Sequence, residues 1–327
     1  MNDYQNFRLK KMQRLFLFIF CYSTCFYAIT SLAQTDWSLK PFISYQKGTL
    51  NIIEGKTEVT SPDQVVRKEF VFYPKNLSLD PRVSLTYKGL ASASINLLSI
   101  KPKKDKIDVQ LQIPRDKFVF DMHFQKYLGY RMRSLDNINF NPIQDEIFKS
   151  NAGTVDLPQM SLVSFGLNAT YIWNNPQFSL QPKNNENWEN ISAGSFLIML
   201  SLTKRIVSNL NSSDDSDVNE SLKMVDDFSQ TSIGFSPGYA YYLPVFQDYF
   251  ISGAAFWGGL LTENRFLDSS KNRVGSQQIS LRARFGYDLG KDFYGINAMK
   301  SIHTTNSGDL SINYSVSLVQ LYYGFRF

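Results

Sequence analysis

Polar residues that can do chemistry occupy every second position of one otherwise apolar segment. Asp121, His123 and Gln125 follow one another at intervals of two, among the aromatic and aliphatic residues of 118–124. Side chains of a β-strand alternate between two faces, so this spacing places all three on one face. A carboxylate and an imidazole on the same face can take part in general acid–base catalysis.

Two further segments repeat this arrangement. Asn168 and Thr170 alternate with apolar residues in one segment, and Arg282 and Arg284 do so in another. If these strands belong to a membrane β-barrel, as predicted below, their apolar faces point outward to lipid and their polar residues point into a shared interior. We call these seven polar residues, from the three segments together, the lumen polar cluster. The cluster has two interpretations. It could select a solute, or its charges could pair with one another and brace a narrow barrel. We favour bracing, because buried charges must be paired.

A hydrolase is a third interpretation of the same residues. His123 and His303 are the two histidines of the chain, and a serine such as Ser164 or Ser280 could complete a triad with Asp121 and His123. Outer-membrane barrels that hydrolyse lipid carry such groups on the lipid-facing surface, whereas the alternation turns His123 inward. The sequence therefore predicts that the protein is not an enzyme, with a lipid-directed hydrolase as an alternative.

Cofactor and metal sites have little support in the sequence. Both cysteines, Cys21 and Cys25, lie in the N-terminal segment, which excludes disulfides and cysteine-ligated metals from the remaining chain. The acidic segment 214–220 resembles a calcium loop, but Glu220 stands where that loop requires glycine. No phosphate-binding glycine loop is present, so we expect no cofactor.

Residues 1–33 have the pattern of a secretory signal peptide. Basic residues precede an apolar run at 15–29, and Ser31-Leu32-Ala33 fits a cleavage site. A membrane anchor is the alternative, but the run is shorter than the ~20 residues of a spanning helix. A lipid anchor on Cys25 is a further alternative. The net charge of +5 falls by three without this segment, which holds four basic residues and Asp3, so no nucleic-acid partner is expected.

The C-terminal segment predicts a membrane-facing strand. Val319, Leu321, Tyr323, Phe325 and Phe327 alternate with mostly polar or small residues. An aromatic terminal strand of this kind resembles the signal read by the barrel-assembly machinery, and Leu321, Tyr323, Phe325 and Phe327 are its candidate residues. The apolar positions change from even to odd numbers near residue 318, for which we predict a β-bulge.

Similar alternation recurs along the chain. We predict an all-β fold, an antiparallel transmembrane β-barrel of about 12 strands with a range of 10–14, over residues 66–327. Residues 34–65 would add the first strand or strands, at 39–45 and 49–53, and Phe178 and Leu180 would start another strand. When strands are counted back from a C-terminus on the periplasmic side, the long segment 133–160 also falls on that side, where turns are normally short.

Six short motifs occur in order along residues 66–327. They are Phe72-Tyr73-Pro74-Lys75-Asn76, Ser84-Leu85-Thr86-Tyr87-Lys88-Gly89-Leu90, Asp121 to Tyr130, Ser192 to Leu197 with Asn174 and Phe178-Ser179 before it, Gly238-Tyr239-Ala240-Tyr241 and Tyr323 to Phe327. Together they resemble a bacterial outer-membrane family known as a domain of unknown function, number 4421. The resemblance implies an outer-membrane barrel and no activity. Residues 188–191 depart from the basic residues usual in that family.

The resulting hypothesis is an exported, integral outer-membrane barrel with a structural or interaction role and a narrow, closed lumen. A passive channel for small solutes is the alternative, and a soluble β-sandwich is the alternative outside membrane proteins. The expected partners are outer-membrane lipid and the assembly machinery, and the sequence makes no prediction of the oligomeric state.

Overall fold

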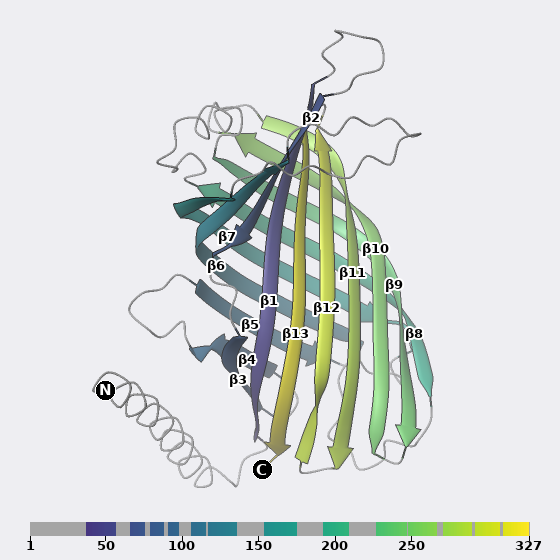
Figure 1. The fold of residues 1–327 in the computed structure, drawn as a ribbon. Helices are drawn as coiled ribbons and strands as arrows, with labels where there is room; N and C mark the ends of the chain where they lie inside the picture. The colour runs from purple at the N-terminus through teal and green to yellow at the C-terminus, as the bar shows by residue number, and fades with distance from the viewer. Residues whose placement is uncertain are drawn as a thin grey trace, which may run out of the picture.

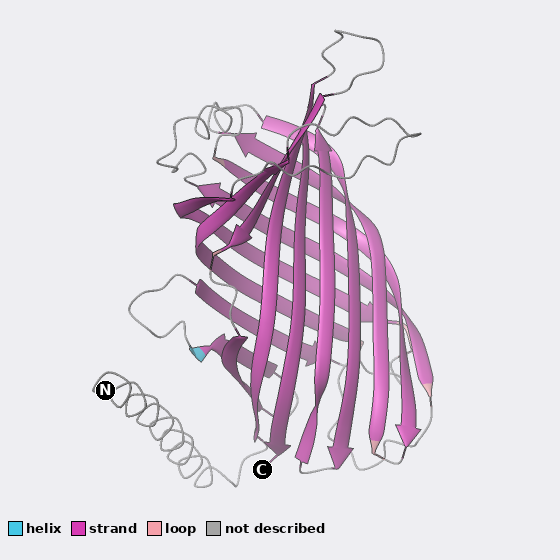
Figure 2. Ribbon diagram, in the orientation of Figure 1, coloured by secondary structure: helices cyan, strands magenta, loops and turns pink. Residues whose placement is uncertain are grey.

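Almost every residue placed by the structure is in a β-strand. The computed structural model describes residues 37–56, 66–75, 79–87, 91–97, 106–115, 117–135, 154–174, 192–208, 227–246, 248–266, 271–289, 292–307 and 310–326. Figure 2 shows this part of the chain as strands, with short loops at some strand ends and one helical residue, Leu97. The described segments contain no helix long and apolar enough to cross a membrane.

Thirteen strands form one antiparallel sheet that closes on itself. Neighbours follow chain order from β6 to β13, and β1 closes the ring by pairing with β13 from Ser38↔Arg326 to Glu54↔Leu310. The predicted antiparallel barrel is confirmed. The strands are β1 (Trp37–Lys56), β2 (Val66–Pro74), β3 (Leu79–Tyr87), β4 (Ala91–Asn96), β5 (Lys106–Arg115), β6 (Phe118–Leu135), β7 (Thr154–Ile172), β8 (Ala193–Ser208), β9 (Phe228–Phe246), β10 (Tyr249–Phe266), β11 (Lys271–Leu289), β12 (Asp292–Ser307) and β13 (Leu310–Arg326).

The ring has different strand numbers at its two ends. We call the end where β13 finishes the lower end, as in Figure 1. In the upper half, β2 alone fills the space between β1 and β6, whereas β3, β4 and β5 fill it in the lower half. The ring thus has ten described strands above (β1, β2 and β6–β13) and twelve below (β1 and β3–β13). Barrel diameter grows with strand number, so the lower half is wider.

A β-bulge lets β6 change partner between these halves. Tyr127 pairs with Lys106 of β5, and Tyr130 pairs with Pro74 of β2, with a register shift between them. Gly129 has a φ of 82°, in the left-handed region that glycine adopts without a steric penalty. Its carbonyl accepts a 3.0 Å hydrogen bond from the Lys75 N–H, which ties the end of β2 to the bulge.

The upper half of the interior is an apolar core. Inward-facing side chains from seven strands meet there, and each has at most 6% of its surface exposed. The set, here called the upper core, is Leu50, Ile52, Phe70, Phe72, Tyr127, Tyr130, Met132, Leu157, Met160, Leu162, Val207, Phe228, Ile312 and Tyr314.

The outer surface of the lower half carries the opposite pattern. Large apolar side chains are exposed around the ring, including Phe246 at 73%, Phe196 at 69% and Leu321 at 60%. Aromatic rings contact one another towards the lower end, for example Phe118–Tyr171 and Tyr287–Tyr294, whose centroids are 5.2 and 4.8 Å apart.

These two apolar regions explain the change of phase in β13. The predicted bulge near residue 318 is wrong, because the pairing of β13 with β1 and β12 shows no register shift there. Even-numbered residues face inward throughout. Ile312, Tyr314 and Leu318 are buried inside, whereas Val319 and Leu321 are exposed outside. In the upper half the inward residues of β13 are apolar because they pack in the upper core. In the lower half its outward residues are apolar because they lie on the exposed apolar surface.

Two other local predictions also need correction. The two strands expected at 39–45 and 49–53 are one continuous strand, β1. Residues Arg133–Leu135 belong to β6 and 154–160 to β7, which leaves 136–153 as the connection, at the upper end. The periplasmic placement of 133–160 came from the extra strand counted at Phe178 and Leu180. These two residues lie outside the described part, and β7 pairs directly with β8.

A buried ionic network lies where the two halves meet. Arg82 of β3 forms an ion pair with Asp108 of β5 at 2.6 Å, and neither side chain has exposed surface. The same Arg82 nitrogen donates to Gln46 Oε1 of β1 at 2.7 Å, and Gln125 of β6 donates to Asp108 at 3.3 Å. This network joins the inserted strands to both β1 and β6.

Replacing Gly129 with valine should destabilise the barrel. A branched side chain at this φ costs about 2 kcal/mol of unfolding free energy, because its Cβ clashes with the backbone. Denaturant unfolding followed by gel mobility measures the change. Gly275→Val is the control, since an added Cβ there meets nothing within 4 Å. Equal stability of the two variants would contradict the strain assigned to the bulge.

Removing one partner of the buried ion pair should be more damaging than removing both charges. Arg82→Met leaves Asp108 charged and buried without its cation, at a cost of about 3–5 kcal/mol. The double variant Arg82→Met/Asp108→Asn removes both charges and keeps a side chain for Gln125 to contact, so it should recover much of this loss. Denaturant unfolding tests this order, and a double variant as unstable as the single one would refute it.

Candidate functional site: a polar cavity below the upper core

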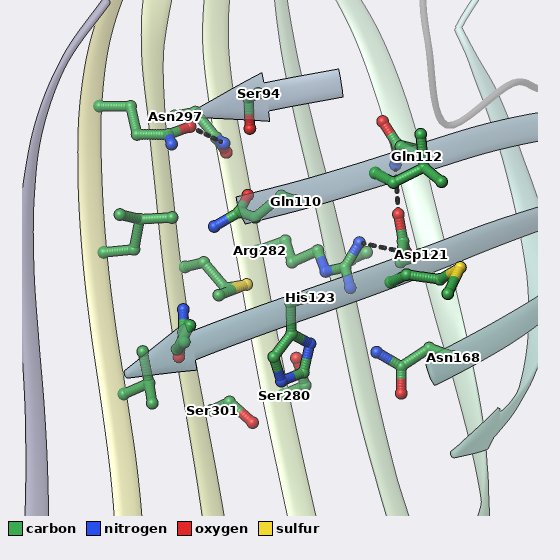
Figure 3. Close-up of a pocket in the computed structure, with 18 of the residues that line it drawn as sticks. Ser94, Gln110, Gln112, Asp121, His123, Asn168, Ser280, Arg282, Asn297 and Ser301 are labelled. Atoms are coloured by element: carbon green, nitrogen blue, oxygen red, sulfur yellow. Dashed lines mark hydrogen bonds and ion pairs between the residues drawn. The ribbon is translucent and has the colours of Figure 1, made fainter. Parts of the chain in front are cut away.

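The lower half of the barrel contains a polar cavity of about 300 Å³. Inward-facing residues of most strands line it, and Tyr314 belongs both to its lining and to the upper core. Figure 3 shows its side chains converging from opposite walls of the barrel. The inserted strands β3, β4 and β5 contribute small or uncharged residues, including Ser84, Ser94 and Gln110. This part of the wall exists only where the ring has twelve strands.

Six of the seven residues of the lumen polar cluster line this cavity. They are Asp121, His123, Gln125, Asn168, Arg282 and Arg284. Thr170 is buried on β7, with 1% of its surface exposed, and is not part of the lining. The structure therefore brings residues from β6, β7 and β11 together, although these segments are far apart in the sequence.

An ion pair crosses the cavity between walls that are not neighbours in the sheet. Arg282 Nη1 of β11 lies 3.6 Å from Asp121 Oδ2 of β6. Gln112 of β5 donates to the other Asp121 oxygen at 2.6 Å, whereas Oδ2 has the Arg282 ion pair and no hydrogen bond among the described residues. Figure 3 shows both contacts. This is the geometry that the bracing interpretation requires.

A second polar contact crosses the lumen close to the upper core. Arg205 Nη1 of β8 lies 2.8 Å from His303 Nδ1 of β12 and donates to Gln230 Oε1 at 2.8 Å. Because a guanidinium can only donate, His303 Nδ1 must accept, and its ring is then neutral with its proton on Nε2. The Arg205 guanidinium also lies 4.5 Å from the centre of the Tyr314 ring.

Three cations of the cavity have no acidic partner. Within the described residues, no carboxylate lies within 4.0 Å of the charged nitrogens of Lys40, Arg205 or Arg284. Lys40 Nζ instead lies 5.3 Å from the Tyr322 ring centre. Among the described residues, the lining contains four basic side chains, Lys40, Arg205, Arg282 and Arg284, and one carboxylate, Asp121.

The sequence interpretation missed Lys40 and Arg205. Lys40 stands in the irregular first segment, where no clear alternation was visible, and Arg205 lies near the end of a strand beside outward-facing Lys204. The signal that could have found them is the inward phase of each strand. Lys40 shares the even-numbered face of Phe42 and Ser44, and Arg205 the odd-numbered face of Ser201 and Val207.

The proposed triad residues lie in the cavity without forming a relay. His123, Ser164 and Ser280 all line it, but no hydrogen bond joins His123 to either serine or to Asp121 in the part of the chain that is described. The His123 ring packs against Gly166, where an added Cβ would fall 2.0 Å from Cε1. The described residues also contain no group of three or more potential metal ligands.

Comparison with solved structures finds barrels of the outer membrane. The outer membrane protease OmpT from Escherichia coli is 9% identical, with a TM-score of 0.43 over 89% of this chain and 97% of that one. The beta domain of the Bordetella autotransporter BrkA is 12% identical, with a TM-score of 0.33 over 90% and 100%. These likenesses are too distant to carry an activity, a ligand or a partner to this chain.

Comparison at the level of sequence gives the family. No curated protein matches the chain. One family model, described as "Domain of unknown function (DUF4421)", matches residues 36–327, which confirms the resemblance seen in the short motifs and extends it to include β1. The chain therefore belongs to the DUF4421 family.

Proposed function

We propose that this protein is an integral outer-membrane barrel that is closed to solute flow and offers a polar cavity to the periplasm. The observation that carries this proposal is the upper core, whose fourteen side chains each have at most 6% exposed surface. Beside them, Ser232, Thr262, Ser276 and Thr305 are joined by hydrogen bonds of 2.7–2.9 Å. A passive channel would need a hydrated path through this region.

The exterior supports the placement in a lipid bilayer. Exposed apolar side chains around the lower half and aromatic contacts near its rim match the apolar band and aromatic girdle of outer-membrane barrels. In a soluble protein, exposed apolar area of this extent would drive aggregation. Leu321 and Tyr323 of β13 face outward, with 60% and 45% of their surface exposed, and we propose that an assembly factor reads this face. Phe327 lies outside the described residues.

The connections support an orientation with the lower end in the periplasm. Those at the upper end include 57–65, 136–153 and 209–226, whereas several at the lower end, such as 88–90 and 290–291, are two or three residues long. Outer-membrane barrels have short periplasmic turns and longer external loops. The connection 175–191 is a long exception at the lower end. Export by the signal peptide proposed for residues 1–33, which lie outside the described residues, is part of this proposal.

The closed barrel makes a direct prediction for electrophysiology. Purified protein inserted into planar bilayers should give no stable, reproducible conductance steps, because the upper core leaves no hydrated path. A trimeric porin reconstituted in the same way is the positive control for insertion. Regular steps that scale with salt concentration would support the channel alternative instead.

The lipid-facing surface makes a second prediction. Leu200 has 57% of its surface exposed on β8, and Leu200→Arg should lower the free energy of unfolding in lipid vesicles by about 2–4 kcal/mol. Gln277→Arg, at an exposed position nearer the upper end of β11, is the matched control and should change it by less than about 1 kcal/mol. Equal effects of the two substitutions would argue against an apolar surrounding at Leu200.

A further inference from the structure

We propose that the cavity is a binding site for a small hydroxylated oxyanion, a molecule with the size and chemistry of a sugar phosphate. The inference rests on the proposed function in one respect, that the upper core closes the cavity from above and leaves the lower end as the route of access. The observations that carry it are the charge, the polar lining and the size of the cavity.

The first observation is an excess of positive charge. Arg282 has Asp121 as its counterion at 3.6 Å, which leaves Lys40, Arg205 and Arg284 uncompensated among the described residues. Cations held together in a protein interior are unfavourable unless an anion offsets them. A bound oxyanion would supply this missing negative charge.

The second observation is the direction from which the cations come. Lys40 lies on β1, Arg205 on β8, and Arg282 and Arg284 on β11, so they come from three separate strands of the ring. Guanidinium groups bind phosphate and carboxylate oxygens through paired N–H donors. Arg205 Nε and Arg282 Nε are buried and have no hydrogen-bond partner, which leaves donor capacity on two of these groups.

The third observation is the uncharged part of the lining. Amide and hydroxyl side chains occupy the space between the cations, and Figure 3 shows them around it. Such groups both donate and accept hydrogen bonds, as sugar hydroxyls do. The set comprises Ser94, Gln110, Asn168, Ser280, Asn297 and Ser301. A site for a bare inorganic ion would have no use for this many neutral partners.

The volume limits the ligand. About 300 Å³ lies at the lower end of the range for small-molecule sites, roughly 300–1,000 Å³. A single phosphorylated or carboxylated sugar suits such a space. A polysaccharide does not, because it exceeds a volume of this size.

Isothermal titration calorimetry on the full-length protein folded in detergent tests the proposal. Glucose 6-phosphate, gluconate, inorganic phosphate and glucose are titrated separately at one fixed ionic strength. We expect saturable binding of glucose 6-phosphate or gluconate, which distinguishes phosphate from carboxylate as the preferred oxyanion. Inorganic phosphate should bind about tenfold more weakly, and glucose should not bind at the same concentrations.

Variants connect the binding to the cavity. Arg284→Gln and Lys40→Gln should each weaken the affinity for the better ligand by about tenfold. Both should leave the melting temperature of the free protein unchanged or raised, because each removes an uncompensated charge. Arg273→Gln, an exposed arginine near the upper end of β11 with an Arg-to-Gln change of the same chemistry, should alter neither. Lower melting temperatures for both cavity variants, with affinity unchanged, would show a structural role instead.

Three outcomes would overturn the proposal. They are the absence of binding by both sugar anions, equal binding of glucose and its phosphate, and binding that survives both cavity substitutions. If inorganic phosphate bound as tightly as the sugar anions, the part of the proposal that requires a hydroxylated ligand would be refuted. The proposal that the barrel is closed is tested separately, and conductance in planar bilayers would refute it. Anion binding by a conducting barrel would refute the proposed function and leave this site in place.

Discussion

The need to pair every backbone N–H and C=O group of the sheet determines the rest of this structure. An apolar surrounding offers the backbone no hydrogen-bond partner, so the sheet must close. Here closure is achieved twice, by β2 in the upper half and by β3, β4 and β5 in the lower half. The Gly129 bulge and the Arg82–Asp108 pair lie at the junction because that is where β1 and β6 exchange one partner for another.

The two halves use the same alternation for different purposes. In the upper half the inward positions are filled by the apolar upper core and, beside it, by hydrogen-bonded Ser232, Thr262, Ser276 and Thr305. In the lower half the outward positions are apolar. The inward positions there line the polar cavity and also form a second buried apolar cluster on β6–β10, which includes Val119, Ile172 and Leu197. Arg205 lies at the boundary, with its charged group against the ring of Tyr314 from the core.

Period-two alternation predicted the architecture and much of the cavity from the sequence. The lower halves of the strands have one apolar and one polar face, which identified Asp121, His123 and Arg282 as inward-facing. Alternation alone could not show whether an apolar face points outward to lipid or inward to a protein core, because both surroundings are apolar. Residues 312–318 look like a strand with a shifted phase, and only the three-dimensional packing shows that they face inward. The sequence also does not show which strands pair. The insertion of β3, β4 and β5 in the lower half and the contact between Arg205 and His303 could therefore not be predicted.

Closure between β1 and β13 has a consequence for how the molecule forms. Of the described strands, β1 is synthesised first and β13 last, yet they lie side by side along nearly their whole length. Until synthesis is complete, β1 has an unsatisfied edge, and its native neighbour does not yet exist. Pairing of such distant segments carries a large loop-closure entropy and is slow. Closure between β1 and β13 must therefore follow the synthesis of β13, and the unpaired edge of β1 needs protection from other chains until then.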